Sequence, residues 1–215
     1  MATGIIYDLD GTIIDTEKLH EEGWIHALAP HGITPARDML SYQKGRSGEA
    51  AAKYMLPAEM QHLVNEVREV KFEYVMKHLG EVPILVNFTE TYEELKRRGV
   101  SIGICTSARP EFITALKPHI PFLEELAQMT VCKGMYERGK PDPQPLLTTL
   151  EKMGNVSPRD VIYVGDAESD YQMALNARIP FAYFCAGEPD SKIPVDVSRM
   201  NDHQQIFRML ENLTE

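Results

Sequence analysis

The stretch that decides the fold is Gly4-Ile5-Ile6-Tyr7-Asp8-Leu9-Asp10-Gly11-Thr12. Its first four residues form a short apolar run, which is typical of a strand buried on both faces of a parallel sheet. Runs of the same character recur at Ser101–Cys105, Met129–Val131, Val161–Val164 and Phe181–Phe184. Helical patterns separate them, at Glu90–Arg98, Asp142–Met153, Asp170–Ala177 and His203–Leu213. This alternation predicts an α/β fold, a doubly wound Rossmann-like core with a parallel sheet.

One long segment interrupts the alternation. Between Thr16 and Leu79 there is no strand-like run, and apolar residues such as Leu63, Val64 and Val67 recur near a helical period. A connection between a strand and the next helix usually has only a few residues. We therefore expect an α/β core at residues 1–15 and 80–215, with an inserted all-helical domain at residues 16–79.

Composition excludes several classes of protein. The chain has 215 residues, a formal net charge of −10 and 25% charged residues, and no basic stripe suited to nucleic acid. No apolar window is long enough for a membrane span, and no basic region leads into an apolar stretch at the N-terminus, so we do not expect a secretory signal. Three cysteines without paired spacing, Cys105, Cys132 and Cys185, indicate a reducing compartment, and we expect a cytoplasmic protein. An anionic substrate would need positive charge from a metal ion or from a few placed Lys and Arg residues.

Two carboxylates follow the first expected strand. Asp8 and Asp10 lie at the carboxyl end of that strand, where ligands bind in doubly wound sheets. They repel each other unless a cation intervenes, and Mg²⁺ prefers such oxygen ligands. One carboxylate then suits a nucleophile and the other a proton carrier, while the Gly11 N–H is expected to face an anion. A lone motif of this kind more often ends a strand and caps a helix.

Three downstream features favour the chemical interpretation. Thr106 and Ser107 follow the second expected strand, where a hydroxyl and N–H groups suit a phosphoryl oxygen. Lys140 lies in a stiff Gly-Lys-Pro-Asp-Pro turn, and Asp142 in the same turn is expected to be the N-cap of the following helix. Asp166 and Asp170 follow the expected strand at Val161–Val164. Taken singly, these features are more often helix caps or a solvated lysine. Together they predict one site at one edge of the sheet.

With these motifs, the chain resembles a haloacid-dehalogenase-superfamily hydrolase whose helical cap lies between the first and second motifs. The resemblance extends from Asp8 to about Gly187 and implies a Mg²⁺-dependent phosphatase that works through an aspartyl-phosphate. It implies that Asp8 is the nucleophile and that Asp10 protonates the leaving oxygen and then activates water. It assigns metal binding to Asp8, the Asp10 carbonyl, Asp166 and, directly or as an anchor, Asp170. It assigns phosphate binding to Gly11, Thr12, Thr106, Ser107 and Lys140.

Residues Asp15–His20 and Trp24 resemble the subgroup of β-phosphoglucomutase and of sugar-phosphate and phosphoglycolate phosphatases. The resemblance places His20 near the active site, although a structural histidine fits equally well. Residues 42–47 resemble the cap loop that selects substrate, in which Lys44 and Arg46 would grip an anionic group. The alternative is a solvated loop with two cations, and Arg109 is equally ambiguous.

Departures from the mutase pattern favour hydrolysis. Ala108 and Pro110 replace donors that follow the second motif in mutases, and Gly48 replaces a loop arginine. The fourth motif, Gly165-Asp166 with Asp170, resembles that of phosphatases. A phosphomutase, a non-catalytic relative used for binding and a receiver-type phospho-acceptor domain are the alternatives. We expect a monomer that acts on a small phosphorylated metabolite, without nucleic-acid or membrane partners. Arg178 replaces the usual helix-ending glycine, which puts the geometry of that turn in doubt.

Overall fold

The computed structural model describes residues 4–43, 46–187 and 189–212. Packing divides the chain into two units, of which one comprises the residues up to Asp15 and from Pro83 onward, and the other Thr16–Val82. The second boundary lies three residues beyond the expected one. The reason is local, because the Val82 N–H donates to the Leu79 carbonyl while the Pro83 carbonyl accepts from the Asp15 N–H. Among the described residues, no helix combines the length and apolar character needed to cross a membrane.

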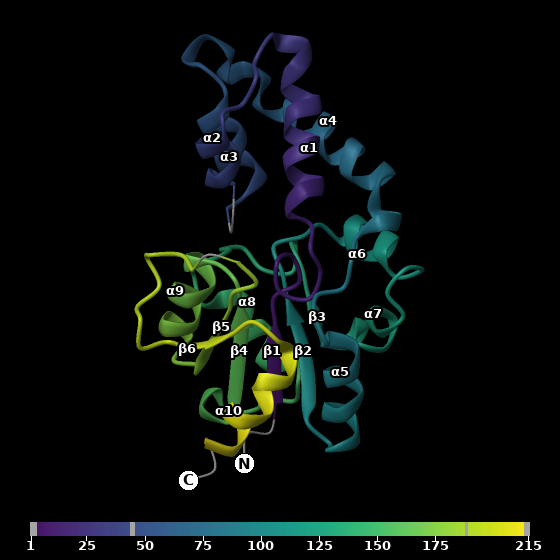
Figure 1. Ribbon diagram of the computed structural model, residues 1–215, viewed down its shortest axis with the longest axis vertical. Coiled ribbons are helices and arrows are strands. Elements are labelled where there is room, and N and C mark those ends of the chain that lie inside the picture. The colour runs from purple at the N-terminus through teal and green to yellow at the C-terminus, as the bar shows by residue number, and fades with distance from the viewer. Residues whose placement is uncertain (1–3, 44–45, 188, 213–215) are drawn as a thin grey trace. The chain divides into compact units, whose positions relative to one another are not determined.

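A parallel sheet of six strands organises the first unit, in the order β3-β2-β1-β4-β5-β6 (Figure 1). The strands are β1 (Gly4–Tyr7), β2 (Ser101–Cys105), β3 (Thr130–Val131), β4 (Val161–Gly165), β5 (Phe181–Phe184) and β6 (Ser198–Met200). In the central register Tyr7 of β1 pairs with Ile104 and with Val164. Strand β1 is buried along its whole length, so its carboxyl end delivers Asp8 to the middle of one sheet edge.

Helices cover both faces of this sheet. They are α5 (Phe88–Arg97), α6 (Pro110–Leu116), α7 (Phe122–Glu125), α8 (Gln144–Lys152), α9 (Glu168–Ala177) and α10 (Ile206–Asn212). On one face Leu146 and Leu150 of α8 and Met173 of α9 pack against Ile6 and Tyr163. On the other, the aromatic cluster of Tyr7, Phe88, Phe184 and His203 closes the core. The doubly wound arrangement is therefore confirmed.

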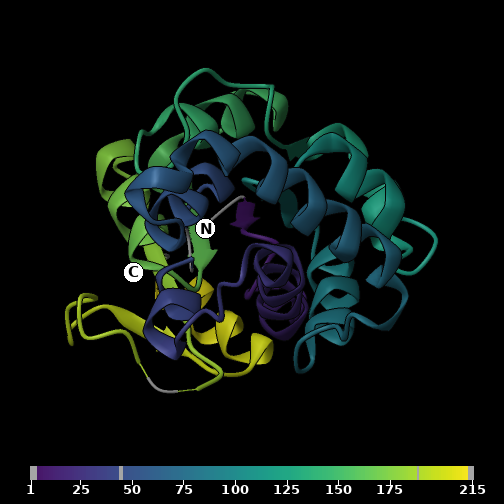
Figure 2. The same cartoon turned by 90° about the horizontal axis from the view of Figure 1, so that it is seen from above.

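The regular secondary structure of the second unit is entirely helical in its described residues. It contains α1 (Glu17–Leu28), α2 (Arg37–Tyr42), α3 (Gly48–Met55) and α4 (Val64–Lys77), with short 3₁₀ turns between them. Helices α1 and α4 pack on each other, and Figure 2 shows α1 almost along its axis. Gly23 permits this approach, because a Cβ there would lie 3.2 Å from a Val75 methyl. Trp24 is buried, and its indole N–H donates to the Gln43 side chain at 2.7 Å.

Several expected elements shift by one or two residues. Met129 ends a 3₁₀ turn instead of beginning β3. Helix α8 begins at Gln144, so Asp142, the expected N-cap, accepts instead from the Gln144 N–H one position outside the cap. The last expected helix is a 3₁₀ turn, His203–Gln205, followed by α10. Strand β6 was not expected, because its three residues include only one apolar side chain, Met200.

Candidate active site

A tight loop follows β1 and holds the paired carboxylates. The Leu9 carbonyl accepts hydrogen bonds from the Ile13 and Ile14 N–H groups, and the Gly11 N–H donates to the Ile14 carbonyl at 2.8 Å. The loop therefore closes on itself through the Gly11 N–H, and the role of that group toward an anion stays a prediction. Gly11 has φ = +78°, and a Cβ there would lie 2.3 Å from an Asp166 oxygen. Only glycine lets the loop pass so close to that carboxylate.

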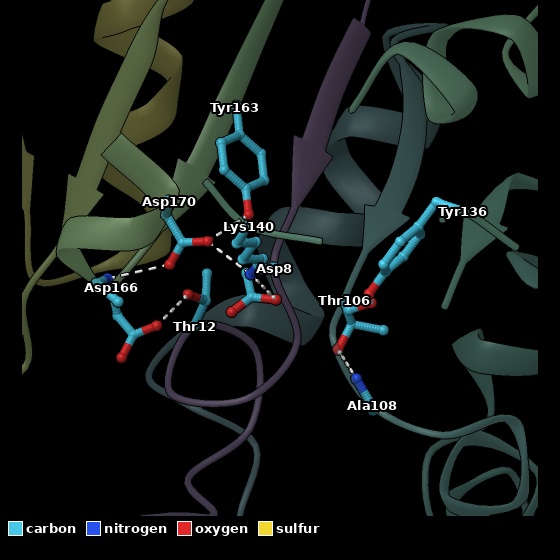
Figure 3. A network of polar contacts seen from close by, with 10 residues as sticks. Asp8, Thr12, Thr106, Ala108, Tyr136, Lys140, Tyr163, Asp166 and Asp170 are labelled. Atoms are coloured by element: carbon cyan, nitrogen blue, oxygen red, sulfur yellow. Dashed lines mark hydrogen bonds and ion pairs between the residues drawn. The ribbon is translucent and has the colours of Figure 1, made fainter. Parts of the chain in front are cut away.

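Asp8 lies in a buried polar network, the charged cluster of Asp8, Lys140, Tyr163 and Asp170 (Figure 3). The Lys140 ammonium lies 2.9 Å from Asp8 Oδ1 and 2.6 Å from Asp170 Oδ1. The Tyr163 hydroxyl donates to the same Asp170 oxygen at 2.6 Å. The loop after β1, strand β4, the 139–143 turn and α9 thus contribute one side chain each, and the cluster joins segments up to 162 residues apart in sequence.

Asp170 has two tasks in this structure. Its Oδ1 holds Lys140 and Tyr163, while its Oδ2 accepts from the Ala167 N–H at 3.1 Å at the start of α9. The helix-capping interpretation and the site interpretation therefore both apply. Gly165 makes room for this arrangement, because a Cβ there would lie 2.6 Å from Asp170 Cβ.

Asp166 joins the site from the other side of the loop. Its Oδ1 accepts from the Thr12 hydroxyl at 3.3 Å, and Thr12 is fully buried. Asp8, Asp166 and Asp170 each offer one carboxylate oxygen, and these three oxygens all lie within 4.8 Å of one another. The structure thus brings together four of the residues that the sequence predicted at one edge: Asp8, Lys140, Asp166 and Asp170.

Thr106 and Ser107 lie at the end of the neighbouring strand β2. The buried Thr106 Oγ1 accepts from the Ala108 N–H at 3.0 Å, and the Tyr136 hydroxyl donates to the Thr106 carbonyl at 3.2 Å (Figure 3). Ser107 is exposed. These bonds order the 106–108 turn at the same sheet edge as Asp8, and the role of both residues in phosphate binding stays a prediction.

The site contains more carboxylate groups than positively charged groups. Burial raises the pKa of Asp8 to about 7; Lys140 acts against this, and the Asp170 and Asp10 carboxylates add to it. Burial and the carboxylates of Asp170 and Asp8 raise the pKa of Asp166 well above its usual value. Burial alone would lower the pKa of Lys140, but Asp170 and Asp8 hold it well above its usual value. Lys140 is therefore a permanent cation.

These residues fit a divalent cation. The donor set is made of carboxylate oxygens, which suit Mg²⁺. Asp8 Oδ1 is buried and accepts no well-aligned hydrogen bond from the described residues, its close contact being the ion pair with Lys140. One lysine can compensate the charge of only one of the three carboxylates. A second positive charge would favour the ionised form of Asp8, which burial and the neighbouring carboxylates disfavour.

His20 and Arg46 belong to the helical unit and make their described contacts there. His20 Nδ1 lies 2.8 Å from the Lys71 ammonium. The Arg46 guanidinium stacks 4.4 Å from the centroid of the Tyr42 ring, which in turn stacks on Tyr54. Lys44 lies outside the described residues. The predicted substrate contacts of His20 and Arg46 remain predictions.

Sequence reasoning missed two side chains that shape the site, Tyr163 and His203, and it did not predict the contact between Thr12 and Asp166. Tyr163 was counted only as part of an apolar run, although a buried tyrosine hydroxyl usually finds a partner. The Thr12 hydroxyl donates to Asp166, and its predicted role in phosphate binding stays a prediction. His203, whose Nε2 lies 2.8 Å from the Thr12 carbonyl, is 191 residues away in sequence, and no local pattern connects the two.

The chain is similar to several known proteins. The family model of haloacid dehalogenase-like hydrolases matches residues 5–184. Phosphoglycolate phosphatase of Agrobacterium fabrum is 26% identical over 181 residues, which are 81% of this chain and 77% of that protein. β-Phosphoglucomutase of Bacillus subtilis is 29% identical over 177 residues, 77% of this chain and 75% of that protein. A crystal structure of a hydrolase of this superfamily from Entamoeba histolytica, 19% identical, covers 99% of both chains with a TM-score of 0.84 and supports the fold.

Proposed function

Because the chain belongs to the haloacid dehalogenase-like hydrolase family and its relatives include phosphatases, we propose that it is a Mg²⁺-dependent phosphatase of small phosphomonoesters. One observation carries the proposal: a buried carboxylate, Asp8, lies 2.9 Å from the Lys140 ammonium and beside two further carboxylates. This combination of a nucleophile, a fixed cation and a set of oxygen ligands suits phosphoryl transfer, which requires mainly positioning and stabilisation of negative charge.

Asp8 and Asp166 are the side chains that would hold the metal ion, together with the Asp10 carbonyl. Both oxygens of Asp170 already have partners in Lys140, Tyr163 and Ala167, so we assign Asp170 to anchoring the lysine. When bound, the cation would neutralise the carboxylates and the non-bridging phosphoryl oxygens.

In the proposed first step, an Asp8 oxygen attacks phosphorus and the bond from phosphorus to the ester oxygen breaks. Asp10, two residues further along the same loop, donates a proton to the departing alkoxide, which leaves as an alcohol. Lys140 lies beside the attacking carboxylate and stabilises the negative charge on the phosphoryl oxygens. The product is an aspartyl-phosphate on Asp8.

In the second step, Asp10 acts as the base. It takes a proton from a water molecule, the water oxygen bonds to phosphorus, and the bond from phosphorus to Asp8 breaks. Inorganic phosphate leaves, Asp8 is again a carboxylate, and Asp10 is again protonated for the next turnover. No further reactant is needed.

The test is phosphate release from a panel of sugar phosphates, phosphoglycolate, nucleoside monophosphates and p-nitrophenyl phosphate, with Mg²⁺ or with EDTA. We expect Mg²⁺-dependent release that falls by at least about 10³-fold in Asp8→Asn, because the amide is not a nucleophile. Asp160→Asn is the matched control, since this exposed carboxylate lies at the opposite end of β4.

Three results would overturn the proposal. Unchanged phosphate release by Asp8→Asn would show that Asp8 is not the nucleophile. Undiminished phosphate release in EDTA would show that the reaction does not need the metal ion. Conversion of a sugar phosphate into its isomer without phosphate release would indicate a mutase instead.

A further inference from the structure

The C-terminal segment reaches the catalytic loop through one buried side chain. His203 follows β6 in a 3₁₀ turn and is 0% exposed. Its Nε2 lies 2.8 Å from the carbonyl oxygen of Thr12. A carbonyl only accepts hydrogen bonds, so Nε2 carries the proton and donates it.

The imidazole ring is held on several sides. Phe184 of β5 stacks on it at 4.4 Å between ring centroids and 11° between planes. The rings of Phe88 and Tyr7 meet it edge-on, at 5.0 Å and 5.7 Å. The His203 backbone N–H donates to the Val86 carbonyl at 3.5 Å, and the preceding Asp202 accepts from the Asn87 side chain at 2.7 Å. The direction of the Nε2–H bond is thereby fixed.

Thr12 connects His203 to the Asp166 carboxylate of the site. Its carbonyl accepts from His203, while its hydroxyl donates to Asp166 Oδ1. One buried residue therefore links the ring to a carboxylate that the proposed function assigns to the metal. A hydrogen bond that orients a ligand through an outer partner commonly changes metal affinity by about 10- to 100-fold.

We propose that His203 is a positioning residue of the active site, which sets the orientation of Asp166 through Thr12 and so tightens Mg²⁺ binding. This inference rests on the proposed function, because it takes Asp166 as a metal ligand. His203 touches neither substrate nor metal. It acts by fixing the loop that carries Asp8, Asp10 and Thr12.

The experiment measures Mg²⁺ binding to the full chain by calorimetry, without substrate. His203→Phe keeps an aromatic ring in the stack and removes the donor. We expect a Mg²⁺ dissociation constant about tenfold higher than in the wild type. Ile206→Val is the matched control, because this buried residue of the same segment has no part in the hydrogen bonds to Thr12. Its dissociation constant should stay within about twofold of the wild type.

Thr12→Val tests the second link by itself. It removes the hydroxyl from Asp166 and keeps the backbone carbonyl for His203, so it should also weaken Mg²⁺ binding. The double variant should bind Mg²⁺ more tightly than the product of the two separate losses predicts, because both changes break one chain of contacts. If His203→Phe does not fold, Thr12→Val alone tests the link to Asp166. His203→Gln, which retains an N–H donor, should then bind Mg²⁺ with a dissociation constant close to that of the wild type.

The outcomes separate this inference from the proposed function. Wild-type Mg²⁺ binding in His203→Phe, or in Thr12→Val, overturns the positioning role while leaving the phosphatase intact. Strictly multiplicative losses in the double variant also overturn it, because the two residues would then act independently. A wild-type chain that releases phosphate but binds no Mg²⁺ overturns the metal assignment. A rescued affinity in His203→Gln supports the donor, as opposed to the ring, as the feature that matters.

Discussion

Tyr7 and Asp8 are neighbours in the chain, yet they contribute to two buried clusters of opposite character. Asp8 joins the charged cluster with Lys140, Tyr163 and Asp170, in which every member has a charged or hydrogen-bonding partner. Tyr7 joins the aromatic cluster, where its hydroxyl and His203 Nδ1 have no hydrogen-bond partner among the described residues. Successive residues of a strand point to opposite faces, so one strand supplies both.

Burial has opposite consequences in the two clusters. In the charged cluster it raises the pKa of Asp8 to about 7, and the carboxylates around Lys140 keep that side chain a cation. In the aromatic cluster burial lowers the pKa of His203 to about 4, because the loss of hydration outweighs the hydrogen bond to the Thr12 carbonyl and the nearby Asp202 carboxylate, which both favour the charged ring. The charged cluster is thus suited to reaction, and the aromatic cluster to fixing a neutral donor.

The largest effect is expected from removing the cation of the charged cluster. Lys140→Met leaves the Asp8 and Asp170 carboxylates buried without their counter-ion, which typically costs about 3–5 kcal/mol of stability. Turnover should also fall by at least about 100-fold. The free energy of unfolding in EDTA and kcat in Mg²⁺ are the measurements.

Lys192→Met is the matched control for this change. Lys192 lies 3.0 Å from Glu168, but its side chain is 55% exposed. Such a surface pair contributes at most about 1 kcal/mol. If both variants lost the same stability, the burial of Lys140 would have no energetic consequence, and the contrast between the clusters would disappear.

The two clusters should respond to acid with opposite signs in the metal-free protein. Between pH 3.8 and about 7, folded Asp8 binds a proton that the unfolded chain lacks, so its contribution to stability is lost as pH rises through 7. Between about pH 6.5 and 4 the unfolded chain protonates His203 and the folded state does not, so stability is lost as pH falls. The histidine alone contributes roughly 3 kcal/mol over this range.

Denaturant unfolding in EDTA at pH 5 and pH 8 separates these contributions. Removing Asp8 in Asp8→Asn should make the protein lose more stability on acidification than the wild type does. Removing His203 in His203→Phe should make it lose less. Identical pH dependence in the wild type and both variants would show that neither group titrates as the structure implies.

A pair of tyrosines on neighbouring strands sharpens the comparison further. The Tyr163 hydroxyl donates to the Asp170 carboxylate at 2.6 Å, and hydrogen bonds to charged groups contribute about 1.5–3 kcal/mol. Tyr163→Phe should therefore reduce the free energy of unfolding by that amount. Tyr7→Phe removes a buried hydroxyl without a partner among the described residues, and should raise stability by about 1 kcal/mol. A loss in Tyr7→Phe as large as that in Tyr163→Phe would contradict this distinction.

The sequence predicted the charged cluster better than the aromatic one, for a physical reason. Parallel strands end at one edge, so Asp8 and the residues after Val164 had to meet near each other. The position of Lys140 could be predicted because its proline-containing turn is stiff. The aromatic cluster depends on His203, which follows a strand of three residues that carries no apolar run. Its partner Thr12 lies 191 residues away, and periodicity has no information on such a contact.

The smallest effect is expected at Arg178, which lies outside both clusters. It ends α9 in the left-handed conformation with φ = +57°, and its N–H donates to the carbonyls of Ala174 and Leu175. The absence of a glycine therefore did not change the turn; it placed a side chain in a conformation that costs about 1 kcal/mol or more.

Arg178→Gly should raise the free energy of unfolding by about 1 kcal/mol. Ala177→Gly, one residue earlier in helical backbone, should lower it by a similar amount. Denaturant melts of both variants give the two signs directly, and turnover in Arg178→Gly should equal that of the wild type. A loss of stability in Arg178→Gly would mean that the arginine side chain contributes more than its backbone strain costs.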